Sequence, residues 1–110
     1  MAAKTYPGEF EQMVLLAILQ CGERAFALEV REEIERSADR RVSRGAFYTT
    51  LDRLASKGMV SWTEQVPDRP RGSARLRRYE LTRDGHAALR NSRRALLELW
   101  RGLDGILDQA

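Results

Sequence analysis

The feature that most restricts the fold is a nearly continuous apolar stretch from Phe10 to Leu19, which Gly22 ends. It is too long for a strand and contains good helix formers, so it predicts a helix over 8–21. Its longest unbroken apolar run begins at Met13 and has seven residues, whereas a membrane-spanning helix needs about 20. A helix that is apolar on most sides must be buried on most sides. A chain of 110 residues forms one core, so we expect a partner chain to cover part of this helix.

Two amphipathic helices are predicted next. Residues 25–37 repeat an apolar side chain every four positions, and residues 43–57 do so every three or four. A short link or strand over 40–42 separates them. Ser43 is the predicted N-cap of the later helix, and Gly58 is its predicted C-cap. The exposed face of that helix would carry Arg44, Gly45, Tyr48, Thr49, Asp52 and Arg53.

The second half of the chain predicts a hairpin and a long helix. Residues 59–66 and 75–81 are rich in β-forming side chains, and the basic, turn-forming segment 67–74 separates them. Residues 82–107 predict a helix of about 39 Å, which is longer than so small a domain covers. Its apolar residues form a coiled-coil-like seam, so we expect it to pack against a second protomer. The seam contains Leu89, Leu96, Leu99, Trp100, Leu103 and Ile106, with Ser92 as a polar interruption.

Three helices followed by a basic hairpin is the element order of a winged helix-turn-helix. The expected fold class is therefore mainly α with a small β-hairpin (α+β). We expect a winged helix-turn-helix DNA-binding domain over 8–81. A C-terminal dimerisation helix over 82–107 would pack with the first helix as one structural unit.

The charge distribution independently indicates a polyanionic partner. Residues 1–39 contain four basic and eight acidic side chains, residues 40–78 contain ten and three, and residues 79–110 contain five of each. The middle third therefore carries a net charge of +7, and nine of its ten basic residues are Arg, which favours forked contacts to phosphate and guanine. This third includes the predicted third helix and the hairpin. The expected partner is double-stranded DNA.

Several function classes are disfavoured by composition. The single Cys21 and the single His86 leave no cluster for a metal and no ordinary Cys/His nucleophile, and no acid/base pair or glycine-rich phosphate loop is visible. We therefore expect no enzyme activity, no cofactor and no metal. One cysteine excludes an intrachain disulfide, and the N-terminus lacks the apolar core of a signal peptide. The expected location is the bacterial cytoplasm, at the nucleoid when bound to DNA, without membrane contact.

The residues also resemble a family. The similarity covers about residues 8–103 and rests on five strings in order: GEFE at 8–11, LLAIL at 15–19, VSRGAFYTTLDRL at 42–54, KGMV at 57–60 and RRYELTRDG at 77–85. In this order and spacing they resemble the PadR family of bacterial transcriptional regulators, and the single C-terminal helix is similar to its short subgroup. The resemblance implies a homodimeric repressor of a palindromic operator, released by a small aromatic or drug-like ligand.

The chain departs from the family pattern in two places. Phe26 and Ala27 stand where the family commonly has Tyr-Gly, so the local packing lacks a phenol hydroxyl and gains a methyl group. Phe47 stands where Leu is more usual and is a larger core side chain. Neither departure touches the predicted DNA-reading positions.

The predicted DNA contacts begin at the N-terminus of the third helix. Ser43, Arg44 and Gly45 are placed to grip a phosphate, and Arg44 could instead fork onto a guanine. Tyr48 suits a phosphate or packs against the wing, and Thr49 suits the methyl group of thymine. For Arg53 the alternatives are a phosphate contact and an ion pair with Asp52 or with another acid.

The wing would add phosphate or minor-groove contacts from Arg69, Arg71, Arg75 and Arg77. Arg78 should face the opposite side of its strand from Arg77. Lys57 is interpreted either as a solvated helix end or as a phosphate contact.

Trp100 has two interpretations. It packs in the core or the dimer seam, or it stacks on a flat ligand in a cavity between protomers, where Phe10 and Met13 would line the same space. Trp62 is predicted to anchor the hairpin on the helices. Cys21 is predicted to be a small buried apolar residue, and His86 an exposed helix residue.

The competing hypothesis is a winged-helix protein-interaction module without sequence-specific DNA binding. The basic wing and the face formed by Arg44, Tyr48 and Thr49 argue against it.

Overall fold

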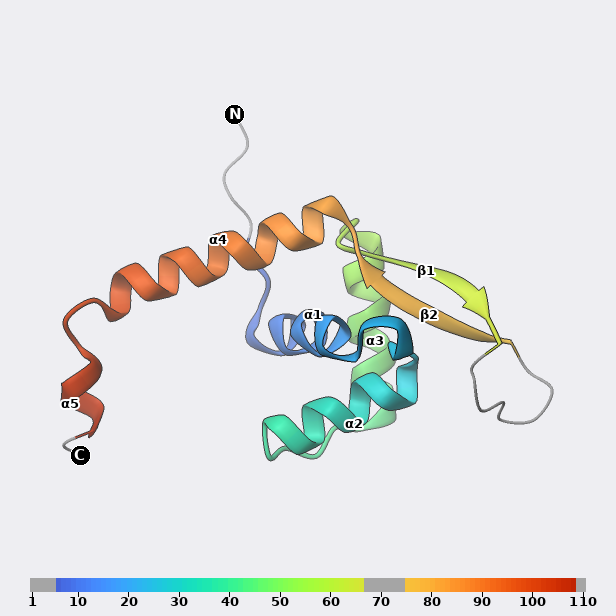
Figure 1. Ribbon diagram of the computed structural model, residues 1–110, viewed down its shortest axis with the longest axis horizontal. Coiled ribbons are helices and arrows are strands. Elements are labelled where there is room, and N and C mark those ends of the chain that lie inside the picture. The colour runs from blue at the N-terminus through green and yellow to red at the C-terminus, as the bar shows by residue number, and fades with distance from the viewer. Residues whose placement is uncertain (1–5, 67–74, 109–110) are drawn as a thin grey trace.

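The computed structural model describes residues 6–66 and 75–108. Within them the chain is mostly helical, with one two-stranded antiparallel hairpin, as predicted (Figure 1). The elements in chain order are α1 (Glu9–Cys21), the 3-10 helix η1 (Gly22–Arg24), α2 (Ala27–Ser37), α3 (Arg44–Ser56), β1 (Val60–Gln65), β2 (Leu76–Leu81), α4 (Arg83–Trp100) and α5 (Asp104–Asp108).

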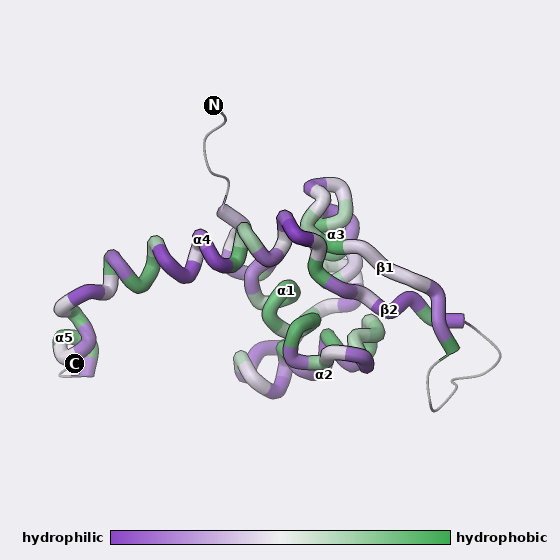
Figure 2. Tube along the Cα trace, turned by 45° about the horizontal axis from the view of Figure 1, so that its top comes forward, coloured by the Kyte–Doolittle hydropathy of each residue, from purple (hydrophilic) through white to green (hydrophobic). Residues whose placement is uncertain are grey.

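Helix α1 forms the centre of the domain and packs against α2, α3, β2 and α4 (Figure 1). Val14 and Leu15 are fully buried, and Figure 2 shows the apolar character of this helix. Leu16 and Leu19 point elsewhere and remain 50% and 45% exposed. One side of α1 thus stays uncovered by its own chain. Gly22, which ends the helix as predicted, has φ +58° and so occupies a conformation that glycine adopts easily.

Helix α2 begins two residues later than predicted. Phe26 is extended and forms an isolated antiparallel bridge with Arg78, and the Tyr79 N–H donates to the Ala25 carbonyl at 2.9 Å. The backbone before α2 thus joins the edge of β2 instead of entering the helix. The link over 40–42 contains no strand, and the Val42 N–H donates to Glu35 Oε2 at 2.9 Å.

The hairpin pairs Val60 with Leu81 and Gln65 with Leu76. Each strand is shorter than predicted, and β1 ends at Gln65. The end nearest the helices is buried through Val60, Tyr79 and Leu81, whereas the outer part of β1 is mostly exposed. The helices therefore hold the base of the wing, and its outer part extends beyond them (Figure 1). The segment 67–74 lies outside the described residues.

The predicted continuous helix over 82–107 is wrong. Helix α4 ends at Trp100, Gly102 adopts φ +78°, and the short α5 follows after a bend. The backbone leaves the helical conformation at Arg101 (φ −53°, ψ 123°), and Gly102 lies in the turn that the Leu103 N–H closes on the Trp100 carbonyl at 2.8 Å, so α4 is about 27 Å long instead of about 39 Å. Its first half packs on α1 through the buried Ala88 and Ser92, and its second half projects away from the domain (Figure 1). No helix in the described part of the chain has the length and apolar character needed to cross a membrane.

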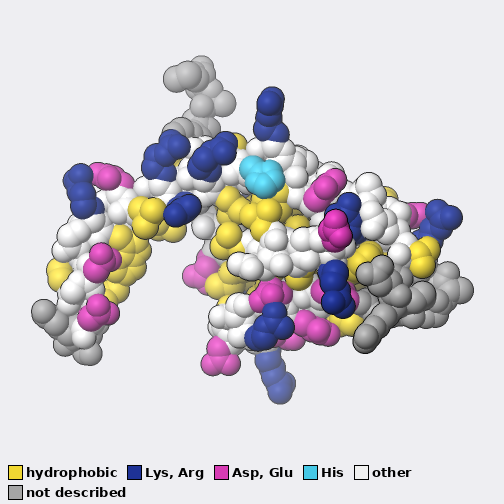
Figure 3. All heavy atoms as spheres, in the orientation of Figure 1, with side chains coloured by type: hydrophobic (Ala, Val, Ile, Leu, Met, Phe, Trp, Pro, Cys, Tyr) yellow, Lys and Arg dark blue, Asp and Glu magenta, His cyan; other side chains and the backbone are white. Residues whose placement is uncertain are grey.

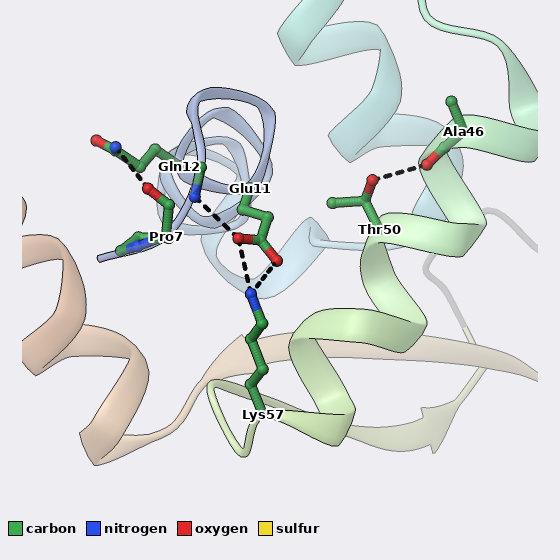
Figure 4. A network of polar contacts seen from close by, with 7 residues as sticks. Pro7, Glu11, Gln12, Ala46, Thr50 and Lys57 are labelled. Atoms are coloured by element: carbon green, nitrogen blue, oxygen red, sulfur yellow. Dashed lines mark hydrogen bonds and ion pairs between the residues drawn. The ribbon is translucent and has the colours of Figure 1, made fainter. Parts of the chain in front are cut away.

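A partly buried ion pair joins the start of α1 to the end of α3 (Figure 4). Lys57 Nζ lies 2.8 Å and 3.0 Å from the two carboxylate oxygens of Glu11, which is 7% exposed. Glu11 Oε1 also accepts the Gly8 N–H at 2.9 Å. Lys57 is exposed at the end of α3, and its ion pair with Glu11 is a contact that neither interpretation from the sequence included.

Candidate nucleic-acid interface

The N-terminus of α3 is built as predicted. Ser43 is extended, and its Oγ accepts the Ala46 N–H at 3.2 Å, which caps the helix. Arg44 and Gly45 in the first turn are exposed, and nothing lies within 4 Å of the position that a Cβ on Gly45 would occupy. The first turn of an α-helix leaves backbone N–H groups without helical partners. An anion could therefore approach this backbone closely.

One face of α3 is exposed beyond this turn. Tyr48 is 38% exposed, and the Arg44 guanidinium lies 5.8 Å from the centre of its ring. The Phe47 and Tyr48 rings pack edge-on, with their centres 5.6 Å apart. Thr49 and Arg53 are also exposed. The opposite face is buried and includes Thr50, whose Oγ1 donates to the Ala46 carbonyl at 2.8 Å (Figure 4).

Arg53 sits near the ion pair at the end of α3. Burial of the Glu11 carboxyl raises its pKa, but hydrogen bonds from Lys57 and Gly8 and the positive charges of Lys57 and Arg53 outweigh that effect. The net result is a lowered pKa of Glu11. No ion pair between Arg53 and Asp52 occurs among the described residues, and the acid that the charge of Arg53 acts on is Glu11.

Arg77 lies against the Trp62 ring in the wing. Its guanidinium is 3.9 Å from the centre of that ring, and both side chains project from the same face of the hairpin as Tyr79. Trp62 is 40% exposed, and the Arg77 guanidinium over its ring comes from the wing itself; that Trp62 anchors the hairpin on the helices stays a prediction. Arg78 occupies the opposite face and is partly buried. Arg75 is exposed, and Arg69 and Arg71 lie outside the described residues.

A cleft of about 500 Å³ lies where α2, α3 and β2 meet. Four arginines line it, three from these elements and one from the residue directly before β2, and its apolar lining includes Phe26, Phe47 and Leu76. Burial raises the pKa of the Tyr79 phenol at its edge, against the effect of a hydrogen bond from Arg77, so this phenol is uncharged at neutral pH. The arginines are Arg31, Arg44, Arg75 and Arg77.

Arg31 is the lining residue that sequence reasoning missed. It lies in a segment with Glu29, Glu32, Glu33 and Glu35, so the net charge of α2 conceals it. Its position three residues before Ile34, at the edge of the apolar stripe, could have indicated that its side chain lies beside the core-facing side of α2.

An apolar groove runs along α4 and α5. Its lining consists of Leu96, Leu99, Trp100, Leu103, Ile106 and Leu107. These side chains are between 39% and 73% exposed, and Figure 3 shows apolar atoms gathered on the inner side of the α4–α5 arm. Leu89 differs from the rest of the predicted seam because it packs partly buried against the core of its own chain.

Phe10 and Met13 are not among the described residues that line this groove. They pack against the core at the start of α1, where the Arg40 guanidinium lies 4.9 Å from the centre of the Phe10 ring and 3.8 Å from Met13 Sδ. One chain alone therefore does not bring them to Trp100.

Two remaining expectations concern single residues. Cys21 is partly buried against the core, and burial together with Glu33 and Glu29 raises the pKa of its thiol. This agrees with its interpretation as a small apolar residue. His86 is exposed, as expected.

The chain is similar in sequence to known transcriptional regulators. Residues 15–91 match the family described as "Transcriptional regulator PadR-like family". The transcriptional regulator Rv3488 from Mycobacterium tuberculosis is 46% identical over 65 residues, a match that covers 59% of this chain and 57% of that protein. The matched segment therefore spans little more than half of that relative.

Solved structures show the same fold. A PadR-like transcription factor from Bacteroides fragilis has a TM-score of 0.69 at 23% identity, covering 88% of each chain. A PadR family regulator from Clostridium difficile has a TM-score of 0.65 at 18% identity, covering 91% of this chain and 96% of that one. F93 from STIV, a winged-helix DNA-binding protein, has a TM-score of 0.61 at 18% identity, covering 84% and 91%. These likenesses establish the winged-helix fold.

Proposed function

This chain belongs to the PadR-like family of transcriptional regulators, and on that premise we propose that it is a homodimeric repressor of a palindromic DNA operator. Members of this family are transcription factors and not enzymes. The observation that carries the proposal is the convergence of the exposed α3 N-terminus and the arginines of the wing on one cleft. Repression would follow if the operator overlaps a promoter, because the bound dimer would exclude polymerase.

Helix α3 would enter the major groove with its N-terminal turn first. Ser43 and the backbone at Gly45 would bind a phosphate, while Arg44 would contact a phosphate or fork onto a guanine. Tyr48 and Thr49, one turn later, would contact a phosphate and a thymine methyl group. Ser43 already caps the helix, so its hydroxyl would serve both the helix and the DNA.

The wing and the distal part of α3 would hold the DNA backbone. Arg77 is exposed on β2, Arg75 is exposed directly before that strand, and Arg53 is exposed on α3. Arg69 and Arg71, outside the described residues, are proposed as further wing contacts. Because these contacts are cationic, each phosphate that they neutralise releases a counterion, and affinity would fall steeply with salt.

Charge reversal at Arg44 tests this docking. A duplex is first enriched from a random-sequence pool by the wild-type protein, and binding is then measured by fluorescence anisotropy. We expect Arg44→Glu to abolish binding, while the matched reversal Arg90→Glu on α4 leaves it close to wild type. Circular dichroism and sedimentation check that both variants stay folded and associated. Unchanged affinity in Arg44→Glu, or failure of the wild type to enrich or bind DNA, would overturn the proposal, and the latter would favour a protein-interaction module.

The second copy would cover the apolar groove of α4 and α5. Monomeric proteins rarely expose a contiguous apolar patch of this kind, whereas interfaces do. Leu16 and Leu19 on α1 are also exposed and would add to the same interface. We infer that Leu96, Leu99, Trp100, Leu103 and Ile106 form its centre, and that Leu89 contributes at its edge.

An effector site between the protomers is the remaining part of the proposal. Trp100 is 39% exposed in the apolar groove, and its indole offers a flat stacking surface. Phe10 and Met13 would approach it from α1 of the partner. The test is titration with 8-anilinonaphthalene-1-sulfonate, an aromatic probe of apolar surfaces, in the presence of the enriched duplex. We expect the probe to bind the wild type and release DNA, and Trp100→Leu to bind it more weakly. No binding, or no effect on DNA affinity, would contradict an effector role for this groove.

A further inference from the structure

The cleft between α2, α3 and β2 has a chemical character that the α3 and wing contacts alone do not explain. Its volume is about 500 Å³, and its described lining contains four arginines and no acidic side chain. The rest of the lining is aromatic or aliphatic, including Phe26, Leu28 and Tyr48. Leu28 and Tyr48 are 37% and 38% exposed, so apolar surface is offered to whatever enters the cleft.

Arg31 reaches this cleft from α2 and forms no ion pair with its own helix among the described residues. The acidic residue at the i+4 position is Glu35, whose Oε2 accepts the Val42 N–H at 2.9 Å. The positions three and four residues before Arg31 are Leu28 and Ala27, which carry no charge. No ion pair of Arg31 is found among the described residues. By contrast, Arg36 on the same helix is paired with Glu33 at 2.5 Å.

Four cations in one cleft repel one another, and an anion seated among them relieves that repulsion. A sugar–phosphate strand presents an anionic phosphate and an apolar deoxyribose side by side. This combination matches guanidinium groups set beside an apolar lining, and arginine forks suit phosphate oxygens. The cleft also opens beside the exposed N-terminal turn of α3, where the DNA backbone would pass.

We propose that this cleft seats the DNA sugar–phosphate backbone and that Arg31 is its phosphate-binding residue from α2. This inference rests on the proposed function, because it requires DNA at the same face. It adds a third element to the interface beyond α3 and the wing. Arg31 positions the duplex and reads no base, so its contribution is the same for every DNA sequence.

The test compares Arg31→Met, which keeps the aliphatic stem, with Arg31→Lys, which keeps the charge. Arg36→Met on α2 is the matched control. Affinity for the enriched duplex and for a scrambled duplex is measured over a salt series. We expect Arg31→Met to weaken binding to both duplexes by about tenfold, and to lower the slope of log affinity against log salt by about 0.9 for each arginine lost. Arg31→Lys should restore the slope, and Arg36→Met should change neither value.

A second measurement locates the phosphate. Single methylphosphonate substitutions, which remove one phosphate charge, are scanned along the duplex. We expect one position per half-site that weakens the wild type but has no further effect on Arg31→Met. If wild type binds DNA while Arg31→Met keeps its affinity and slope, the inference fails and the proposed function stands. If every methylphosphonate position affects wild type and Arg31→Met equally, the inference also fails. Absence of DNA binding by the wild type would instead overturn the proposed function.

Discussion

Single residues hold the proposed recognition helix at both of its ends. At its start, Ser43 Oγ accepts the Ala46 N–H. At its end, Lys57 binds the Glu11 carboxylate on α1. The helix that would read DNA is thereby fixed to the helix at the centre of the domain.

The Glu11–Lys57 pair makes stability depend on pH. The pKa of Glu11 is lowered in the folded protein, so the fold binds fewer protons at this site than the unfolded chain does. Its contribution is therefore complete above the ordinary glutamate pKa of 4.5 and is lost as pH falls through the lower folded value. We expect Lys57→Met to cost about 1–3 kcal/mol at pH 7 and to flatten the acid side of the stability curve. Urea unfolding between pH 7 and pH 3 measures both, and parallel curves for the two proteins would contradict this account.

Two glycines should respond oppositely to alanine. A Cβ on Gly85 would lie 2.1 Å from the Met59 carbonyl oxygen, so Gly85→Ala should destabilise the fold by about 1–3 kcal/mol. Gly45 has open space and lies in a helix, so Gly45→Ala should stabilise it by up to about 1 kcal/mol. The same methyl group would separate the α3 backbone from a phosphate, and we expect about tenfold weaker DNA binding. Thermal unfolding and anisotropy check this pair, and unchanged DNA affinity in Gly45→Ala would count against close backbone approach.

The residues that could be predicted from sequence are those whose partners are near in sequence. The Ser43 cap depends on a residue three positions away. The partner of Lys57 could not be predicted because Glu11 lies 46 positions away, and a helix-end lysine carries no sign of such a partner. The contact of Trp62 with Arg77 could not be predicted because Arg77 comes from the neighbouring strand, across a segment whose length leaves the register open.

Among the helices and strands, the main difference from the prediction is the bend between α4 and α5, where one continuous helix was expected. The leucine repeat continues across the bend, so the pattern alone predicted one seam. Gly102 was the sequence signal for the end of the helix, since glycine commonly follows a helix. In the structure this glycine has φ +78°. The start of α2 was similarly missed because the bridge of Phe26 with β2 depends on tertiary structure.

The bend should be essential to the apolar groove, because the groove is lined from both α4 and α5. Gly102→Ala places a side chain at positive φ and should cost about 1 kcal/mol in each protomer. We expect the dissociation constant of the dimer, measured by sedimentation over a series of decreasing concentrations, to rise at least tenfold. Gly105→Ala, a matched change within α5 in open space, should leave the dimer equally strong or stronger. Equal weakening by both variants would show that the bend has no special role.

In the whole molecule, the first half of α4 packs within the domain and the second half carries an exposed apolar surface. The first half is held on α1, and the second half carries the apolar groove away from the domain. A partner bound there would set the separation of two α3 helices, which must match half-sites about 34 Å apart. A ligand between the protomers could change DNA affinity only by binding the two dimer geometries unequally.

Breaking the proposed dimer should therefore weaken operator binding without touching the DNA face. Leu99 is 73% exposed, so Leu99→Glu leaves the single chain able to fold. A charge there cannot be buried unpaired in an apolar interface. We expect a folded monomer in sedimentation experiments and at least a hundredfold loss of affinity for a two-half-site duplex, but little change for one half-site. A Leu99→Glu protein that remains dimeric would place the interface elsewhere.

We propose that this chain is a dimeric, sequence-specific DNA-binding regulator. Titration of the wild-type protein onto the enriched duplex and a scrambled duplex of equal length, at two salt concentrations, tests dimerisation and specificity together. We expect two protomers per enriched duplex, tight binding to that duplex alone, and a steep loss of affinity at the higher salt. Equal affinity for both duplexes, or no binding to either at low salt, would contradict it.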